Sequence, residues 1–262
     1  MKRFESFMAP LMEEFLSYRE SQGYVLKNYK AKLQRFDDYL VENGKDSGLL
    51  DSAFFLEMRI NLKMEPSSVN LTLSAVRNLF QFLLRRGYYQ SNPLRDVPPM
   101  KNPTVVPFIF TPEQTDQFLD AMCRRFHKTK NRFLTDVAVY IALLLLARCG
   151  MRISEPLKLL RHHYRSDDRT LYIEKTKFSK DRLLPIPQRV ATEIENYLSV
   201  RKSLMRKDQS AHLLVQANQR PLSIWKVRDM FHILVSDIGL EQPRRVIGNV
   251  IFSAPTPHSF RH

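Results

Sequence analysis

The sequence predicts a mainly α-helical protein of two domains: a four-helix N-terminal domain, then an α-rich domain with a small antiparallel sheet. Apolar residues recur at three- and four-residue steps through much of the chain, the spacing of one helix face. Hydrophobic residues make up 44% of the 262 residues and glycines number only 7, which favours packed helices over a turn-rich β protein. A proline-rich stretch separates two parts, and the length suffices for two cores.

Four apolar stripes predict the helices of the first domain, residues 1–91. Each stripe has the spacing of a buried helix face. Gly23, Gly44 and Gly87 follow three of the stripes and are expected to end those helices. The stripes cover residues 4–16, 26–40, 54–62 and 67–86.

Polar and basic side chains lie on the outer faces of two of these helices. Asn70, Ser74 and Arg77 recur at helical spacing opposite an apolar stripe, and Lys30 lies on the exposed side of the second helix. Such faces are expected to contact phosphates and base edges in a major groove. For each residue taken alone, an ordinary solvated surface is the alternative.

Prolines spaced from Pro93 to Pro112 predict an extended linker over residues 92–110. Proline lacks the amide donor and disfavours helix in the residue before it. Lys101 lies within this stretch, and a basic, extended connector suits a protein that closes around a duplex. We therefore include Lys101 among the expected DNA contacts.

The second domain is expected over residues 111–262. It begins with a helix over residues 111–125, where Thr-Pro-Glu-Gln supplies the cap and first turn. The apolar run over residues 134–148 predicts a central buried helix. The remaining expected elements are a sheet strand near 162–165, a hairpin of strands 171–173 and 183–186, and helices 187–206 and 223–238.

Arg152 lies at a joint between two predicted helices. Gly150 ends the first, and the second begins at Ser154 or Glu155. Ser154 is a candidate N-cap, Glu155 suits the positive end of a helix dipole, and Pro156 is tolerated only in a first turn. In isolation, Arg152 and Glu155 would be an ordinary surface pair three residues apart.

Charge is concentrated in the second part of the chain. The formal net charge is +14; residues 1–100 hold 14 Lys and Arg against 12 Asp and Glu, which leaves residues 101–262 with a net charge of +12. Such a field favours a polyanionic partner, because binding phosphates releases counterions. A solvated basic surface is the alternative for charge alone.

The sequence also favours a cytoplasmic protein without a membrane span. The longest apolar run, Val137 to Ala147, is too short to cross a bilayer, and early glutamates exclude a signal peptide. Cys123 and Cys149 are the only cysteines, and their spacing fits neither a metal site nor a disulfide framework.

The second domain offers the residue types needed for phosphoryl transfer without a metal. Arg152 lies at the helix joint, a lysine lies in the polar turn, and His258 and Arg261 are three residues apart. Guanidinium groups bind two non-bridging oxygens as charge develops, while lysine and histidine can move protons. We see no carboxylate cluster for Mg²⁺ and expect no metal and no cofactor.

Three motifs in order resemble the tyrosine recombinases, the phage-integrase family. They are Gly150 to Glu155, Lys177 to Pro185 and His258 to His262. The four-helix domain and proline-rich linker are similar to that family's core-binding domain and its connection. The resemblance implies site-specific recombination, integration or transposition through a 3′-phosphotyrosyl intermediate, with four copies on two double-stranded DNA sites, in the cytoplasm at the nucleoid.

The resemblance also implies roles for single residues. Arg152 and Arg261 would clamp the scissile phosphate, Lys177 would protonate the leaving 5′ oxygen, His258 would assist proton transfer, and Glu155 would support the site. Lys177 is chosen because it lies five residues before the strand that begins at Arg182, as the family lysine does. For the neighbouring Lys175 and Lys180, we expect phosphate contacts.

One departure from the family concerns the nucleophile, because no tyrosine follows the His-x-x-Arg-His motif within these 262 residues. We therefore expect them to bind DNA without cleaving it. A competing hypothesis is a non-enzymatic DNA-binding form that occupies recombination sites. A weaker one is a basic module that prefers RNA.

Overall fold

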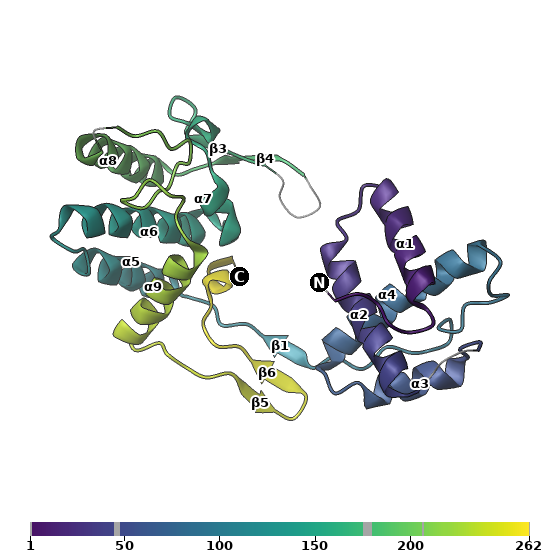
Figure 1. Ribbon diagram of the computed structural model, residues 1–262. Helices are drawn as coiled ribbons and strands as arrows, with labels where there is room; N and C mark the ends of the chain where they lie inside the picture. The colour runs from purple at the N-terminus through teal and green to yellow at the C-terminus, as the bar shows by residue number, and fades with distance from the viewer. Residues whose placement is uncertain (1, 45–47, 175–179, 206, 262) are drawn as a thin grey trace. The chain divides into compact units, whose positions relative to one another are not determined.

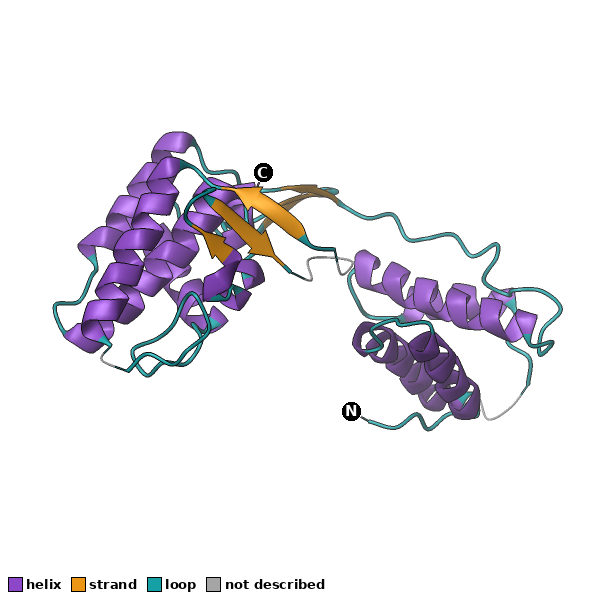
Figure 2. Cartoon of the chain, turned by 90° about the horizontal axis from the view of Figure 1, so that it is seen from above, coloured by secondary structure: helices purple, strands orange, loops and turns teal. Residues whose placement is uncertain are grey.

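A computed structural model describes residues 2–44, 48–174, 180–205 and 207–261 (Figure 1). The chain divides into two compact units, a first unit of residues 1–103 and a second of residues 104–262. All described strands belong to the second unit, as the orange arrows in Figure 2 show. The mainly helical fold class that the sequence predicts is confirmed. No helix in the described part of the chain has the length and apolarity that crossing a membrane requires.

The first unit has the four predicted helices, which share one apolar core. The core includes Phe36, Phe55 and Phe80, whose rings lie within 5.2 to 6.4 Å of one another. Because each helix contributes one buried face, the amphipathic stripes sufficed to find all four. They are α1 (Ala9–Ser21), α2 (Lys27–Glu42), α3 (Ser52–Asn61) and α4 (Pro66–Arg85).

The predicted start of the first helix at Phe4 is wrong. α1 begins at Ala9 because Pro10, which has no amide hydrogen, fits only its first turn. Before it, the backbone amides of Glu5 and Ser6 donate to the buried carboxylate of Asp37, at 2.8 and 2.9 Å. This non-helical segment brings Phe4 into the core, which made the apolar stripe look longer than the helix.

The segment expected as a linker is divided between the two units. Its first part, to Pro103, packs on the first unit, where Leu94 and Val97 are buried. Arg77 of α4 donates to their carbonyl oxygens, from Nε to Leu94 at 3.2 Å and from Nη2 to Val97 at 3.0 Å. Asn70 exchanges two hydrogen bonds with the backbone of Met100, at 2.9 and 2.7 Å.

The second unit is built around α6, as predicted. This helix is buried on nearly all sides from Leu134 to Leu146. Its neighbours α5, α8 and α9 cover it. The predicted capping box at Thr111 and Gln114 is present at the start of α5. The bounds are α5 (Pro112–Arg124), α6 (Lys130–Cys149), α8 (Gln188–Leu204) and α9 (Ile224–Asp237).

The predicted antiparallel sheet is confirmed, in the order β2-β3-β4. A short 3-10 helix, η1 (Arg161–His163), precedes it. In the β3–β4 ladder, Ile173 pairs with Arg182. The strands are β2 (Tyr164–Arg165), β3 (Thr170–Ile173) and β4 (Arg182–Pro185).

A second sheet was not predicted. Its order is β1-β6-β5, with β1 parallel to β6. The hairpin of β5 and β6 has a sequence signal, two short apolar runs around Gly248 and Asn249. The parallel pairing of β1 joins residues some 150 positions apart, which local patterning does not show. The strands are β1 (Thr104–Val106), β5 (Arg245–Ile247) and β6 (Val250–Phe252).

The joint around Arg152 differs from the prediction in its cap. Gly150 ends α6 in the left-handed conformation, at φ 58°, as predicted. The next helix, α7 (Ser154–Lys158), has Ile153 at the N-cap, so the prediction that Ser154 caps it is wrong. Ser154 is exposed, and the carboxylate of Glu155 accepts the backbone amide of Arg152 instead, at 2.7 Å.

We expect Gly150→Ala to lower the free energy of unfolding by about 1 to 2 kcal/mol, because an L-residue is strained at this positive φ. An added Cβ would meet no atom within 4 Å, so the cost is conformational rather than steric. Gly150→Asn, the matched variant, should cost less, since asparagine tolerates this region. Urea unfolding of both variants measures the difference; equal stability of Gly150→Ala and the unsubstituted protein would contradict the assignment.

Candidate functional site

Glu155 is a buried carboxylate that two arginines share. Its Oε1 accepts from Arg152 Nη1 at 2.8 Å, and its Oε2 accepts from Arg182 Nη2 at 2.9 Å and from the Arg152 amide. The Glu155 side chain is 6% exposed, whereas both arginine side chains are 33% exposed. The buried acid therefore holds two cations that remain open to solvent.

Arg261 is brought to the same place by an aromatic anchor. It ends the 3-10 helix η2 (Pro257–Arg261), which packs against α6. The preceding residue, Phe260, stacks on Phe110 at 4.4 Å and meets Phe118 at 5.1 Å. Ser259 is buried, and its Oγ accepts the backbone amide of Thr256 at 3.0 Å. Ser259 and Phe260, which lie between His258 and Arg261 in the motif, thus hold this segment in place.

The guanidinium group of Arg261 lies within electrostatic reach of Arg152 and Arg182. The pKa of Arg261 is lowered by burial and by the positive charges of Arg152 and Arg182, while Glu155 acts in the opposite direction. Within the described part of the chain, Arg261 has no hydrogen-bond or ion-pair partner. Three arginines against one glutamate leave two positive charges uncompensated, an arrangement that suits a phosphate.

The structure brings together three of the predicted catalytic-domain residues and adds one. Arg152, Glu155 and Arg261 form one cluster; Arg182, which the predictions did not include, is its fourth member. Its position at the start of the strand after the polar turn was the available signal. His258 is exposed and belongs to the same 3-10 helix as Arg261, where residues three apart share a face. Lys180 is exposed just before β4, whereas Lys175 and Lys177 lie outside the described residues.

In the first unit, the predicted DNA contacts divide into two groups. Ser74 and Lys101 are exposed, and Lys30 is half-buried with its Nζ 5.8 Å from the ring of Phe4. Asn70 and Arg77 instead hold the backbone of residues 94–100 on α4. Their polar groups are therefore satisfied within the unit.

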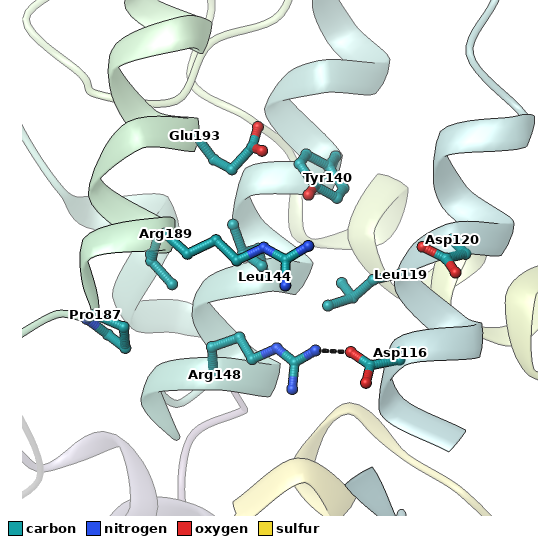
Figure 3. Close-up of a pocket in the computed structure, with 10 residues that line it drawn as sticks. Asp116, Leu119, Asp120, Tyr140, Leu144, Arg148, Pro187, Arg189 and Glu193 are labelled. Carbon is teal, nitrogen blue, oxygen red and sulfur yellow. Dashed lines mark hydrogen bonds and ion pairs between the residues drawn. The ribbon is translucent and has the colours of Figure 1, made fainter. Parts of the chain in front are cut away.

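A separate pocket lies among α5, α6 and α8 (Figure 3). Arg148 reaches across to Asp116, and Arg189 and Glu193 extend from α8 toward Tyr140. Burial and the negative charge of Glu193 raise the pKa of Tyr140 to about 12. Arg152, Arg182 and Arg261 do not line this pocket, and the charged side chains that do line it carry both signs. It is not the site that the motifs indicate.

Two family models match the chain. The model described as "Phage integrase family" matches residues 109–262, and that described as "Phage integrase, N-terminal SAM-like domain" matches residues 12–87. Among curated relatives, the chain is 28% identical to the tyrosine recombinase XerD of Chlorobaculum tepidum, over 96% of this chain and 80% of that protein. It is 26% identical to the tyrosine recombinase XerA of Pyrococcus furiosus, over 99% and 80%.

Solved structures share the fold. A lambda integrase dimer bound to a COC′ core site matches 96% of this chain and 67% of that chain, with a TM-score of 0.66 and 16% identity. The Tn1549 transposon integrase in complex with circular intermediate DNA matches 98% and 85%, with a TM-score of 0.67 and 17% identity. At these identities the likeness establishes the fold.

Proposed function

This chain belongs to the phage integrase family, and from that premise we propose that it binds double-stranded DNA as part of a tyrosine recombinase, which breaks and rejoins strands at specific sites. One observation carries the proposal. Arg152 and Arg182 bind a single carboxylate, and Arg261, whose charge interacts with all three groups, is a partly buried cation that makes no hydrogen bond or ion pair with a described residue. Folding alone gains nothing from that arrangement, whereas a bound phosphate would neutralise it.

We assign the chemistry to residues of the second unit. Arg152 and Arg261 would bind the non-bridging oxygens of the scissile phosphate and stabilise the charge that develops there. Lys177 would donate the proton that the leaving 5′ oxygen needs, and His258 would assist proton transfer. Glu155 would keep Arg152 in place. No step requires a metal or cofactor.

DNA binding would draw on both units. Lys30, Ser74 and Lys101 remain candidates for the first unit, with Lys175 and Lys180 for the second. For Asn70 and Arg77, we propose an indirect role, since both hold the segment that ends near Lys101. By family we expect four copies on two DNA sites, and a location with the DNA at the nucleoid.

A polypeptide of residues 1–262 is proposed to hold the phosphate without cleaving it. Two tyrosines of the second unit are engaged elsewhere: Tyr164 donates to Glu195 at 3.0 Å, and Tyr172 donates to Asp181 at 2.7 Å. Burial and the hydrogen bond to Glu195 raise the pKa of Tyr164 to about 12, and the hydrogen bond to Asp181 raises the pKa of Tyr172, which disfavours a nucleophilic phenolate at either residue. The nucleophile would then come from a tyrosine beyond the motif or from another copy.

We expect residues 1–262 to bind duplex DNA more tightly than duplex RNA of the same sequence, because a fold suited to the B-form major groove cannot enter the narrow groove of A-form RNA. Affinity measured at several salt concentrations should fall steeply with salt. Equal affinity for both duplexes at one salt concentration would favour a generic nucleic-acid module instead.

Cleavage is tested with a polypeptide that carries these residues on through a downstream tyrosine of the same reading frame. Incubated with a nicked suicide duplex containing its selected site, it should form a covalent adduct without added metal or ATP. Binding without an adduct would favour the second candidate function, a DNA-binding form that occupies recombination sites.

A further inference from the structure

We propose that Arg182 is a positioning residue of the phosphate site, which fixes the direction of the Arg152 guanidinium through the carboxylate of Glu155. The inference rests on the proposed function and extends it to Arg182, a residue to which the family resemblance assigned no role. It follows from how three side chains share two carboxylate oxygens.

Arg152 and Glu155 alone do not define a fixed direction. They are three residues apart across the start of a five-residue helix, so the pair could move together with that short element. Arg182 approaches the same carboxylate from β4, which is 27 residues away in the sequence. A partner from a second element fixes the carboxylate relative to the sheet as well as to α7.

The backbone that carries Arg182 is itself held. Arg182 pairs with Ile173 in the β3–β4 ladder, and Ile173 is buried in the core of the second unit. The carboxylate of the preceding residue, Asp181, accepts from the Tyr172 hydroxyl at 2.7 Å. The backbone of Arg182 is therefore fixed, and the hydrogen bond from its side chain to Glu155 fixes the carboxylate relative to β4.

The fixed carboxylate leaves the other donors of Arg152 available. Glu155 takes one Nη1 hydrogen and the backbone amide, and no described residue accepts from Nε or Nη2 of Arg152. Because a guanidinium group is planar and rigid, fixing one of its nitrogens aims the others. That aim decides whether Arg152 and Arg261 meet the same phosphate.

Charge alone would be a different role for Arg182. Its positive charge does act on Arg261, since it contributes to the lowered pKa there. Lysine separates the two roles, because it keeps the charge but is about one bond shorter and has no planar fork. A positioning role predicts that lysine fails, and a charge role predicts that it suffices.

The test uses residues 1–262 with inorganic phosphate as the probe, monitored by NMR of ¹⁵N-labelled arginine side chains. Arg182→Gln should weaken phosphate binding about 10-fold and Arg182→Lys about 5-fold, with broadening of the Arg152 Nε–Hε signal in both. Arg165→Gln is the matched control, because it removes an exposed arginine of the same sheet without touching Glu155. It should bind phosphate as the unsubstituted protein does.

A double-mutant cycle identifies the carboxylate as the intermediary. In a Glu155→Gln background, Arg182→Lys should change phosphate affinity by less than about 2-fold, since the shared carboxylate is already gone. If Arg182→Lys binds phosphate like the unsubstituted protein, or if Arg182→Gln matches Arg165→Gln, the positioning role is overturned. If Arg261→Ala leaves phosphate binding unchanged, the proposed function itself fails, whatever Arg182 does.

Discussion

Replacing Arg261 with alanine is expected to slow adduct formation on the suicide duplex by about 100- to 1,000-fold, the usual cost of losing one preorganised donor to a developing charge. The same change should leave the free energy of unfolding equal or raise it by about 0.5 to 1 kcal/mol. The second effect follows from the lowered pKa of Arg261, because burial and the repulsion from Arg152 and Arg182 make its charge a burden in the folded state.

Single-turnover adduct formation and urea unfolding measure the two effects on the same protein. Arg165→Ala provides the control, since it removes an exposed arginine from β2. Both quantities should be unchanged in that variant. A loss of stability in Arg261→Ala comparable to its loss of activity would indicate a structural cation and contradict the assignment.

The cluster of Arg152, Glu155 and Arg261 was predictable where its determinants are local in sequence. Gly150, Arg152 and Glu155 lie within six residues, and the helix joint that positions them can be read from a glycine and a proline. His258 and Arg261 are likewise three residues apart on one short helix. Only the order of the family motifs indicated that these two groups of residues lie together, because no local sequence pattern predicts a contact between residues 152 and 261.

Arg182 was missed because its role depends on a contact that spans 27 residues. In the sequence it is one of several basic residues around a polar turn, and its place at the start of a strand does not by itself indicate a role that Lys175 or Lys180 lacks. The shared carboxylate that distinguishes it becomes visible only when β4 is placed beside α7. A carboxylate shared by two arginines from different elements leaves no periodic signal in the sequence.

Asn70 and Arg77 show the opposite difficulty. Helical spacing correctly placed both residues on the face of α4 opposite the main apolar stripe, but that face is not fully exposed to solvent. An irregular segment without helix or strand covers part of it, and its carbonyl groups need donors. A polar helix face can therefore bind the chain's own backbone, which sequence patterns do not separate from binding a partner.

Arg201→Ala is expected to lower the free energy of unfolding by about 3 to 5 kcal/mol, the cost of breaking a buried ion pair from one side. Arg201 is 1% exposed within α8 and donates two hydrogen bonds to Asp208, at 2.7 and 2.8 Å. It also donates to the carbonyl oxygens of Ser210, His212 and Leu213, at 3.2, 2.7 and 2.8 Å. Alanine would remove this donor from the three carbonyl oxygens, would leave Arg161 as the remaining cation beside Asp208, and would leave a cavity where the side chain had been.

The pH dependence of this loss separates the ion pair from the cavity. Burial would raise the pKa of Asp208, but bonds from Arg201 and the charges of Arg201 and Arg161 lower it overall. A carboxyl group whose pKa is lower in the folded state stabilises the fold at pH values above its unfolded pKa of about 3.9. This stabilisation is lost as the pH falls through the pKa of the folded state. The gap in stability between the unsubstituted protein and Arg201→Ala should therefore be widest near pH 6 to 7 and narrow below about pH 4. Urea unfolding across this range, with the exposed neighbour Lys202→Ala as control, measures it; a gap independent of pH would assign the whole loss to packing.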